Sequence, residues 1–220
     1  QLIKRKIAHG TRNSCFAPAM SEQHALAALN AGMETVQQLP GNVLALGEMG
    51  IGNSSSAALI LARLAQVPLK DAAGRGTGLD DTALMHKREV LLRASQRHPM
   101  AQSPLQVLCA FGGFEIAMMC GAMLQAAAER RVVLVDGFIA GAAALLAVTA
   151  DFGASLAGGV PAQAQSTQAA ASPNALMWIC RVMPFPRFSG GRIVTRGPAP
   201  GQKKGAGVAT RPNVSTAELA

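Results

Sequence analysis

Apolar residues recur at helical spacing in several segments of the chain. One such pattern predicts a helix over about residues 22–38, which Ser21 can cap and Pro40-Gly41 ends. Asp80 or Asp81 can cap a second strongly patterned helix. Taken together, these patterns predict helices over about residues 22–38, 53–66, 82–96, 105–110, 114–129 and 138–148.

Two short runs have a different pattern. Val43 to Leu46 and Val132 to Val135 are apolar at every position, which is typical of parallel strands that are covered on both faces. Each run leads through a turn into a helix, so the order is strand, turn, helix, twice over. This order predicts an α/β domain with a parallel sheet and helices on both faces, a Rossmann-like three-layer arrangement. With two clear strands, the predicted sheet is incomplete.

A glycine-rich turn, Gly47-Glu48-Met49-Gly50-Ile51-Gly52-Asn53-Ser54-Ser55, follows the first strand. Its glycines permit positive φ and let a ligand approach the backbone, and Asn53 or Ser54 can cap the helix that follows. The amides at the start of that helix suit a phosphate. Because the turn is neither a GxGxxG nor a P-loop pattern, its spacing alone fits a turn that binds nothing equally well.

Two acidic residues follow the predicted strands. Ligands of parallel sheets bind beyond the carboxyl ends of the strands, and Glu48 and Asp136 both lie at that edge. A carboxylate repels phosphate, so Glu48 is expected beside an uncharged or cationic part of a ligand, or hydrogen-bonded within the turn.

The character of the sequence changes after about residue 149. Residues 150–205 are rich in Ala, Gly, Pro, Ser and Gln and have no sustained period. We therefore expect an α/β domain over residues 1–149 and a low-complexity, poorly ordered basic tail over residues 150–220. The chain has a net charge of +8, but the basic residues of the tail are spread out and almost without aromatic neighbours. A nucleic-acid partner is not expected.

Other classes of partner are also not expected. No apolar run reaches the roughly 20 residues that a membrane span needs. The four cysteines lie far apart, with no CxxC and no histidine at ligand spacing, which predicts free thiols in a reducing cytoplasm and no metal site. The first residues, Gln1 to Lys6, resemble neither a signal peptide nor a natural start, and we expect a fragment.

The glycine-rich turn is similar to the signature G-E-[ML]-G-[IM]-[AG]-N-[ST]-[ST] of nicotinate-nucleotide–dimethylbenzimidazole phosphoribosyltransferases. Further stretches fit the same family in the same order over about residues 7–148: Asn13 to Ser21, Gly74 to Asp80 with Lys87 downstream, Gly112 to Ile116 leading into Gly121 to Leu124, and Val133 to Ile139.

This resemblance implies a function. The family transfers the phosphoribosyl group of nicotinate mononucleotide to 5,6-dimethylbenzimidazole, giving α-ribazole 5′-phosphate for the lower ligand of cobalamin. A homodimeric cytoplasmic enzyme that needs no metal or cofactor is implied. The imidazole must lose a proton and an oxocarbenium-like centre must be stabilised, which requires nearby carboxylates.

The resemblance also assigns roles to residues. Lys87 matches a lysine near the phosphate, and Glu48 matches a catalytic acid at the base and ribose end. Glu115 and Asp136 match acids at the edge of the cleft. The residues that would form the loop of the nucleotide site are Gly50, Gly52, Asn53, Ser54 and Ser55. From the residues alone, the default interpretation of Lys87 is an exposed helical lysine, while Asp136 can be a helix cap and Glu115 an acid that stabilises a helix N-terminus.

One family motif is not found. The family ends in G-E-G-[ST]-G-A-A, whose glutamate is thought to be the general base, whereas residues 152–217 contain no carboxylate. Loss of a general base costs a factor of about 10² to 10⁴ in rate. We expect a tail translated in a shifted reading frame and a weakened or inactive enzyme. The alternatives are a non-catalytic protein that binds a nucleotide or base through the glycine-rich turn, and a structural protein with a basic tail.

Overall fold

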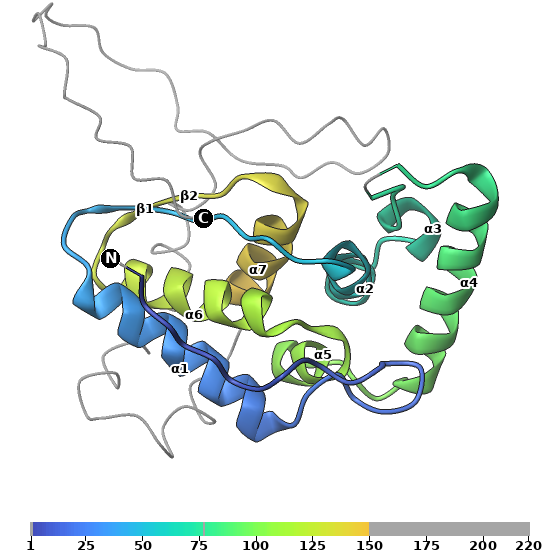
Figure 1. Ribbon diagram of the computed structural model, residues 1–220, viewed down its shortest axis with the longest axis horizontal. Helices are drawn as coiled ribbons and strands as arrows, with labels where there is room; N and C mark the ends of the chain where they lie inside the picture. Colours follow the sequence, from blue (N-terminus) through green and yellow to red (C-terminus); the bar gives the residue numbers. More distant parts are fainter. Residues whose placement is uncertain (1, 77, 150–220) are drawn as a thin grey trace, which may run out of the picture. The chain divides into compact units, whose positions relative to one another are not determined.

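The computed structural model describes residues 2–76 and 78–149, and the predicted tail at 150–220 lies outside the described residues. All described residues belong to one compact unit. In chain order they form α1 (Glu22–Gln38), β1 (Val43–Ala45), α2 (Asn53–Leu64), α3 (Leu69–Ala72), α4 (Asp81–Arg97), α5 (Pro104–Phe111), α6 (Phe114–Ala128), β2 (Val132–Leu134) and α7 (Gly137–Thr149) (Figure 1).

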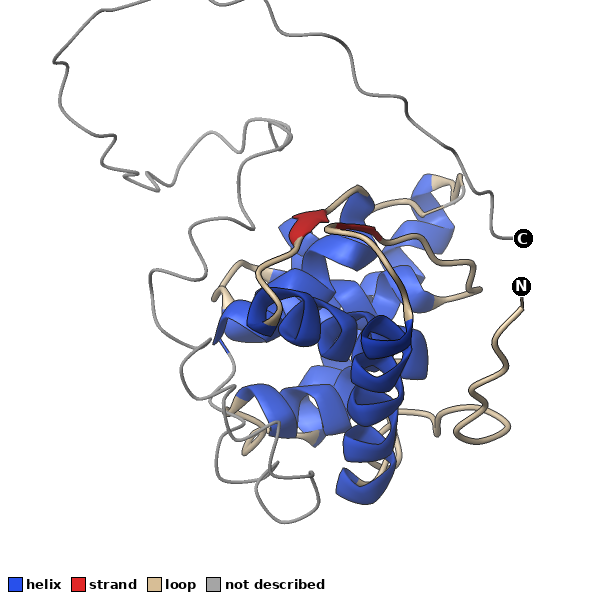
Figure 2. Cartoon of the chain, turned by 90° about the vertical axis from the view of Figure 1, so that its left-hand side faces the viewer, coloured by secondary structure: helices blue, strands red, loops and turns tan. Residues whose placement is uncertain are grey.

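The two strands form a parallel pair, with Val43 opposite Val132 and Ala45 opposite Leu134. The predicted parallel α/β arrangement is confirmed. In Figure 2 the strands lie at one side of the layer of helices that fills most of the described part.

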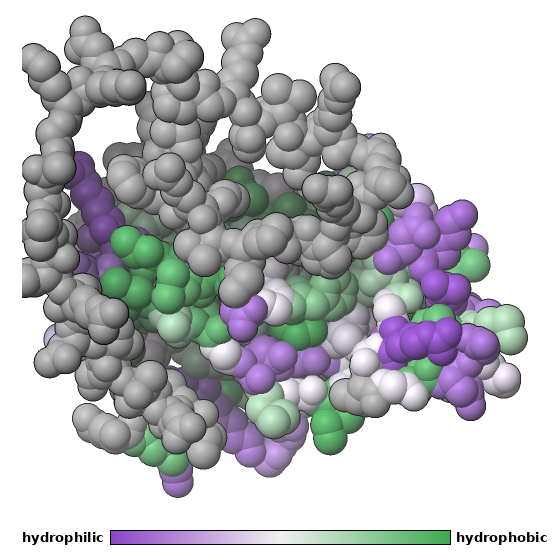
Figure 3. Space-filling view, turned by 90° about the horizontal axis from the view of Figure 1, so that it is seen from above, coloured by the Kyte–Doolittle hydropathy of each residue, from purple (hydrophilic) through white to green (hydrophobic). Residues whose placement is uncertain are grey.

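The burial of the strands differs from the prediction. Successive side chains of a strand point to opposite faces, and Val133 is buried while Val132 and Leu134 are 44% and 38% exposed. Helices therefore cover one face of this sheet, and in the described residues no helix of a second layer covers the other. Figure 3 shows apolar residues gathered toward the strands and hydrophilic residues gathered over α3 and α4.

Local capping explains where several helices begin. The side chain of Ser21 accepts a hydrogen bond from the His24 amide, and Asp80 does the same for the Ala83 amide. Ser103 forms a capping box at the start of α5. The segment after Pro68, which lies outside the predicted helices, contains the short helix α3.

Helices α1 and α6 pack side by side with their backbones in contact (Figure 1). A Cβ atom added at Gly32 would lie 2.0 Å from the carbonyl oxygen of Met118, and one added at Gly121 would lie 2.0 Å from that of Leu29. No larger residue fits at either position unless the helices separate. Gly32 and Gly121 therefore set the distance between the two helices.

Arg63 connects α2 to the end of α4. Its guanidinium donates hydrogen bonds to the carbonyl oxygens of Ser95, His98 and Ala101 at 2.9, 3.0 and 3.1 Å. It also lies 5.4 Å from the centre of the Phe111 ring. Ser95 lies in the last turn of α4 and His98 is its C-cap, so these bonds join α2 to the end of α4.

Further predictions concern cysteines, metals and membranes. Cys15, Cys109 and Cys120 are free, and Cys180 lies outside the described residues. Within residues 2–76 and 78–149, no three His, Cys, Asp or Glu side chains are grouped so as to hold a metal ion. None of the helices described is both long enough and apolar enough to span a bilayer.

The contact between α1 and α6 is tested by Gly121→Ala. The added methyl group meets the backbone of α1, so we expect the free energy of unfolding to fall by about 1–3 kcal/mol or more despite the higher helix propensity of Ala. Urea unfolding followed by circular dichroism measures the change. Gly10→Ala is the control, because a Cβ at Gly10 meets no atom within 4 Å. Equal stability of the two variants would contradict a direct backbone contact.

Candidate functional site

The start of α2 has no side-chain cap. Its N-cap is Gly52, in the left-handed conformation with φ of 87°, rather than the predicted Asn53 or Ser54. A glycine adopts this φ without strain but carries no oxygen that could accept from the first amides of the helix. Among the described residues, the backbone N–H groups of Asn53 and Ser54 therefore have no side-chain acceptor at the positive end of the helix dipole, an arrangement that suits an anion.

Asn53 instead bonds to the glycine-rich turn. Its side-chain Nδ2 donates a hydrogen bond to Oε2 of Glu48. A Cβ at Gly50 would lie 2.6 Å from the same Nδ2 atom, so a glycine at this position leaves room for the bond. Glu48 thus has the local hydrogen bond that was one of its two expected roles, and this bond fixes its carboxylate beside the start of α2.

Lys87 reaches the same place from the second turn of α4. Its Nζ donates hydrogen bonds of 3.1 Å each to the Ser54 hydroxyl and to the Gly74 carbonyl oxygen. Burial lowers the pKa of Lys87, so this is not the exposed helical lysine that its local sequence allows. An ammonium group has three N–H donors, and these two bonds use two of them.

The loop that follows α3 closes beside this lysine. Gly76 has a positive φ of 57°, and a Cβ there would lie 3.5 Å from the Ser54 hydroxyl and 3.8 Å from Lys87 Nζ. Three segments far apart in sequence therefore meet at one point: the start of α2, the loop at Gly74 to Gly76, and α4. The site candidates Ser54 and Lys87 therefore lie in direct contact.

Glu115 lies in the first turn of α6. Its carboxylate folds over the helix start, so that a Cβ at Gly113 would lie 2.2 Å from Glu115 Oε1. Burial raises the pKa of Glu115, a hydrogen bond from its own backbone amide lowers it, and the charge of Glu48 raises it further. Glu48 and Glu115 are thus close enough to interact, and Glu115 also has the expected contact with a helix N-terminus.

Asp136 is exposed and follows β2. The parallel register pairs Ala45 with Leu134, so Asp136 and Glu48 both come after the carboxyl ends of neighbouring strands, as expected. Among the described residues, no hydrogen bond or ion pair connects Asp136 to Glu48 or Lys87. A shared binding site for Asp136 therefore stays a prediction.

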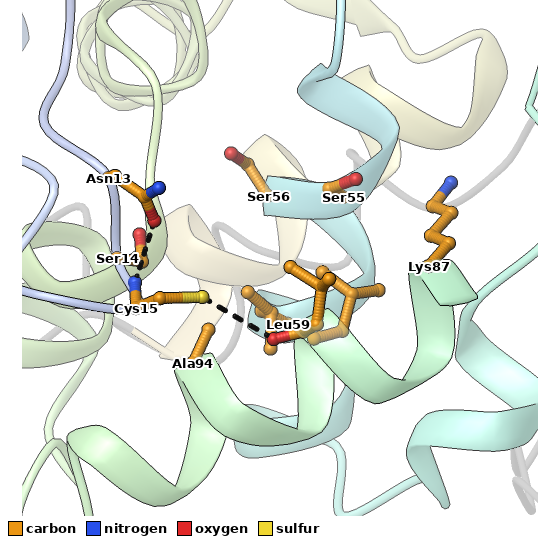
Figure 4. Close-up of a pocket in the computed structure, with 10 residues that line it drawn as sticks. Asn13, Ser14, Cys15, Ser55, Ser56, Leu59, Lys87 and Ala94 are labelled. Atoms are coloured by element: carbon orange, nitrogen blue, oxygen red, sulfur yellow. Dashed lines mark hydrogen bonds between the residues drawn. The ribbon is translucent and has the colours of Figure 1, made fainter. Parts of the chain in front are cut away.

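A cavity of about 260 Å³ lies beside Lys87 (Figure 4). Of its lining residues, Ser55 and Lys87 were site candidates from the sequence. The residues that were not candidates are Asn13, Ser14, Cys15, Ser56, Leu59, Val90, Leu91 and Ala94. The family-like segment at Asn13 was a signal for part of this set. The spacing of the apolar residues in α4 indicated a buried face and gave no sign that the face borders a cavity.

A family model described as "Phosphoribosyltransferase" matches residues 1–169. The chain belongs to this family. The match covers every candidate site residue described above.

Named relatives agree with this assignment. The nicotinate-nucleotide–dimethylbenzimidazole phosphoribosyltransferase of Cupriavidus taiwanensis is 56% identical over 153 residues, covering 68% of this chain and 44% of the relative. The protein of the same name from Variovorax paradoxus is 55% identical over 146 residues, covering 66% and 42%. The chain therefore spans less than half the length of these relatives.

A solved structure confirms the fold. The crystal structure of CobT from Thermus thermophilus matches with a TM-score of 0.64 and 37% identity, covering 67% of this chain and 45% of that chain.

The raised pKa of Glu115 predicts a pH effect on stability. The folded state holds this proton more tightly than the unfolded chain, whose glutamates titrate near about 4.3. The contribution of Glu115 to the free energy of unfolding is therefore fully present below that pH. It is lost as the pH rises through the higher folded-state pKa. We expect the free energy of unfolding of the wild type to fall relative to Glu115→Gln as the pH rises above about 4.3, measured by urea titration. Replacing the exposed Glu89 by Gln should leave the wild-type slope intact; the same slope in Glu115→Gln would refute the assignment.

Proposed function

We propose that the chain binds nicotinate mononucleotide at the start of α2. The whole protein would transfer its phosphoribosyl group to 5,6-dimethylbenzimidazole, giving α-ribazole 5′-phosphate for the lower ligand of cobalamin. The names of the relatives support the reaction. The hydrogen bond between Lys87 and Ser54 at an uncapped helix start is the observation that carries the proposal.

The phosphate is proposed to lie between the start of α2 and Lys87. There it would accept hydrogen bonds from the amides of Asn53 and Ser54 and from the third N–H of the ammonium group. Lys87 is already held by Ser54 and Gly74, so little side-chain entropy is lost on binding. Gly50 and Gly52 keep this approach free of side chains, and Ser55 adds a hydroxyl group.

The carboxylates are proposed to act on the reacting ring. Glu48, held by Asn53, would stabilise the positive charge that develops on the ribose as the pyridine leaves. Glu115, whose pKa burial and the charge of Glu48 raise, is proposed to accept the imidazole proton. Asp136, at the same edge of the sheet, would line the base and ribose end. The pyridinium of the substrate is already an activated leaving group, so no metal or cofactor is needed.

Assembly, location and domain limits also belong to the proposal. We propose a homodimer in the cytoplasm, with the small-molecule substrates as ligands and no nucleic-acid or membrane partner. The catalytic part would be the α/β domain over residues 1–149, followed by the basic tail over residues 150–220.

A second candidate function is a non-catalytic protein that binds the nucleotide or base. It is favoured by one observation, the lack of any carboxylate over residues 152–217, where the family's general base is expected. The two candidates share the phosphate site and differ in whether nicotinate is released.

Binding is tested by titrating nicotinate mononucleotide into the full chain in a calorimeter. We expect Lys87→Ala to weaken binding about tenfold or more, since a hydrogen bond to a charged group contributes about 1.5–3 kcal/mol. Arg93→Ala is the matched control, because Arg93 is an exposed cation on the same helix. If the Lys87→Ala variant and the wild type bound the mononucleotide with equal affinity, the proposed position of the phosphate beside Lys87 would be wrong.

Catalysis is tested by measuring nicotinate release in the presence of dimethylbenzimidazole. We expect Glu48→Gln to lower kcat by about 10² while binding of the mononucleotide changes little, because a Gln carbonyl oxygen can still accept from Asn53. A wild-type chain that binds the mononucleotide without releasing nicotinate would establish the non-catalytic candidate instead.

A further inference from the structure

The cavity beside Lys87 is larger than a phosphate needs. It extends from the lysine between α2 and α4 to the turn at Asn13 to Cys15. Its volume of about 260 Å³ equals that of about nine water molecules in the liquid, at about 30 Å³ each. This leaves room for one six-membered ring.

Polar and apolar groups occupy different sides of the cavity (Figure 4). The hydroxyls of Ser55 and Ser56 and the ammonium of Lys87 lie at one side, and Leu59 and Ala94 lie at the other. No acidic side chain is among the ten residues that line the cavity. The cavity thus combines a cation and hydroxyl donors with an apolar floor, a pattern that favours an amphipathic anion.

The turn at Asn13 to Cys15 forms another side of the cavity and is held by several polar contacts. The Cys15 amide donates to Asn13 Oδ1 at 2.9 Å, and the Cys15 thiol contacts the Val90 carbonyl oxygen at 3.6 Å. His98 Nε2 lies 2.8 Å from the Ser14 carbonyl oxygen, which fastens the turn to the end of α4. These contacts form the cavity without help from a ligand, so binding costs little reorganisation.

We propose that this cavity binds a small organic anion. Its charged head would lie at Lys87 and a single apolar ring would lie between α2 and α4, against Leu59 and Val90. The proposal shares Lys87 with the proposed function but goes beyond it, because the ring occupies space that the phosphate of a mononucleotide at the start of α2 does not fill.

Phenyl phosphate and inorganic phosphate are the probes. In calorimetry with the full chain, we expect phenyl phosphate to bind on the order of tenfold more tightly, because burying one ring contributes about that much. Ser56→Leu adds a large side chain to the lining of the cavity and should remove this difference while inorganic phosphate binds as before. Ser56→Ala adds no volume and should keep the difference.

Alkylation of Cys15 gives a second measurement on the unaltered chain. Phenyl phosphate should slow the reaction of Cys15 with iodoacetamide at least several-fold more than inorganic phosphate does, read by peptide mass spectrometry. Cys109 is the internal reference, since it does not line the cavity. If the Ser56→Leu variant does not fold, the protection of Cys15 by the two probes in the unaltered chain tests the proposal on its own.

Equal affinity for the two probes, or equal protection of Cys15 by both, would overturn the proposal. The same experiments separate the two hypotheses about this region. If the chain prefers phenyl phosphate but does not bind nicotinate mononucleotide, the proposed anion site in the cavity stands and the proposed function fails. If the chain binds the mononucleotide but binds phenyl phosphate and inorganic phosphate equally, the proposed function stands and the proposed anion site in the cavity fails.

Discussion

The direct contact between the backbones of α1 and α6 is the constraint on which the rest of the described structure depends. Gly32 and Gly121 let the two helices approach until each position touches a carbonyl group of the other helix. Helix α6 packs against α7, and α7 packs against α2. The position of the α2 start, where the candidate site lies, therefore follows from the separation of two helices, of which α6 also carries the candidate residue Glu115.

Some contacts of the candidate site join residues that are close in sequence, and others join residues that are far apart in sequence. The glycine-rich turn, the Gly52 cap and the bond from Asn53 to Glu48 all lie within a few residues. Lys87 and Gly74 come from other parts of the chain, and the bonds of Lys87 join them to α2. Arg63 also fastens α2 to the end of α4, so the helix whose first turn has no side-chain cap and the helix that carries Lys87 are joined directly.

The parts of this arrangement that could be predicted are those determined by neighbouring residues. Caps at Ser21 and Asp80 involve atoms three residues apart, so the sequence contains both partners. The cap at Gly52 was missed because Asn and Ser are good caps as well, and only the bond to Glu48 diverts Asn53 from that role. The exposure of Val132 was missed because an apolar strand does not reveal whether a second layer covers it. The wall at Cys15 depends on a contact to Val90, 75 positions away, which no local pattern records.

The outward face of the strands affects how this chain behaves at high concentration. Val43, Val132 and Leu134 present apolar side chains beside a two-stranded sheet whose outer edges have unpaired backbone groups in the part of the chain that the structure describes. Open edges of this kind act as templates onto which another polypeptide can add a strand. These edges therefore offer the described part of the chain a route to self-association, and conditions that strengthen apolar attraction, such as warming or sulfate-type salts, favour it.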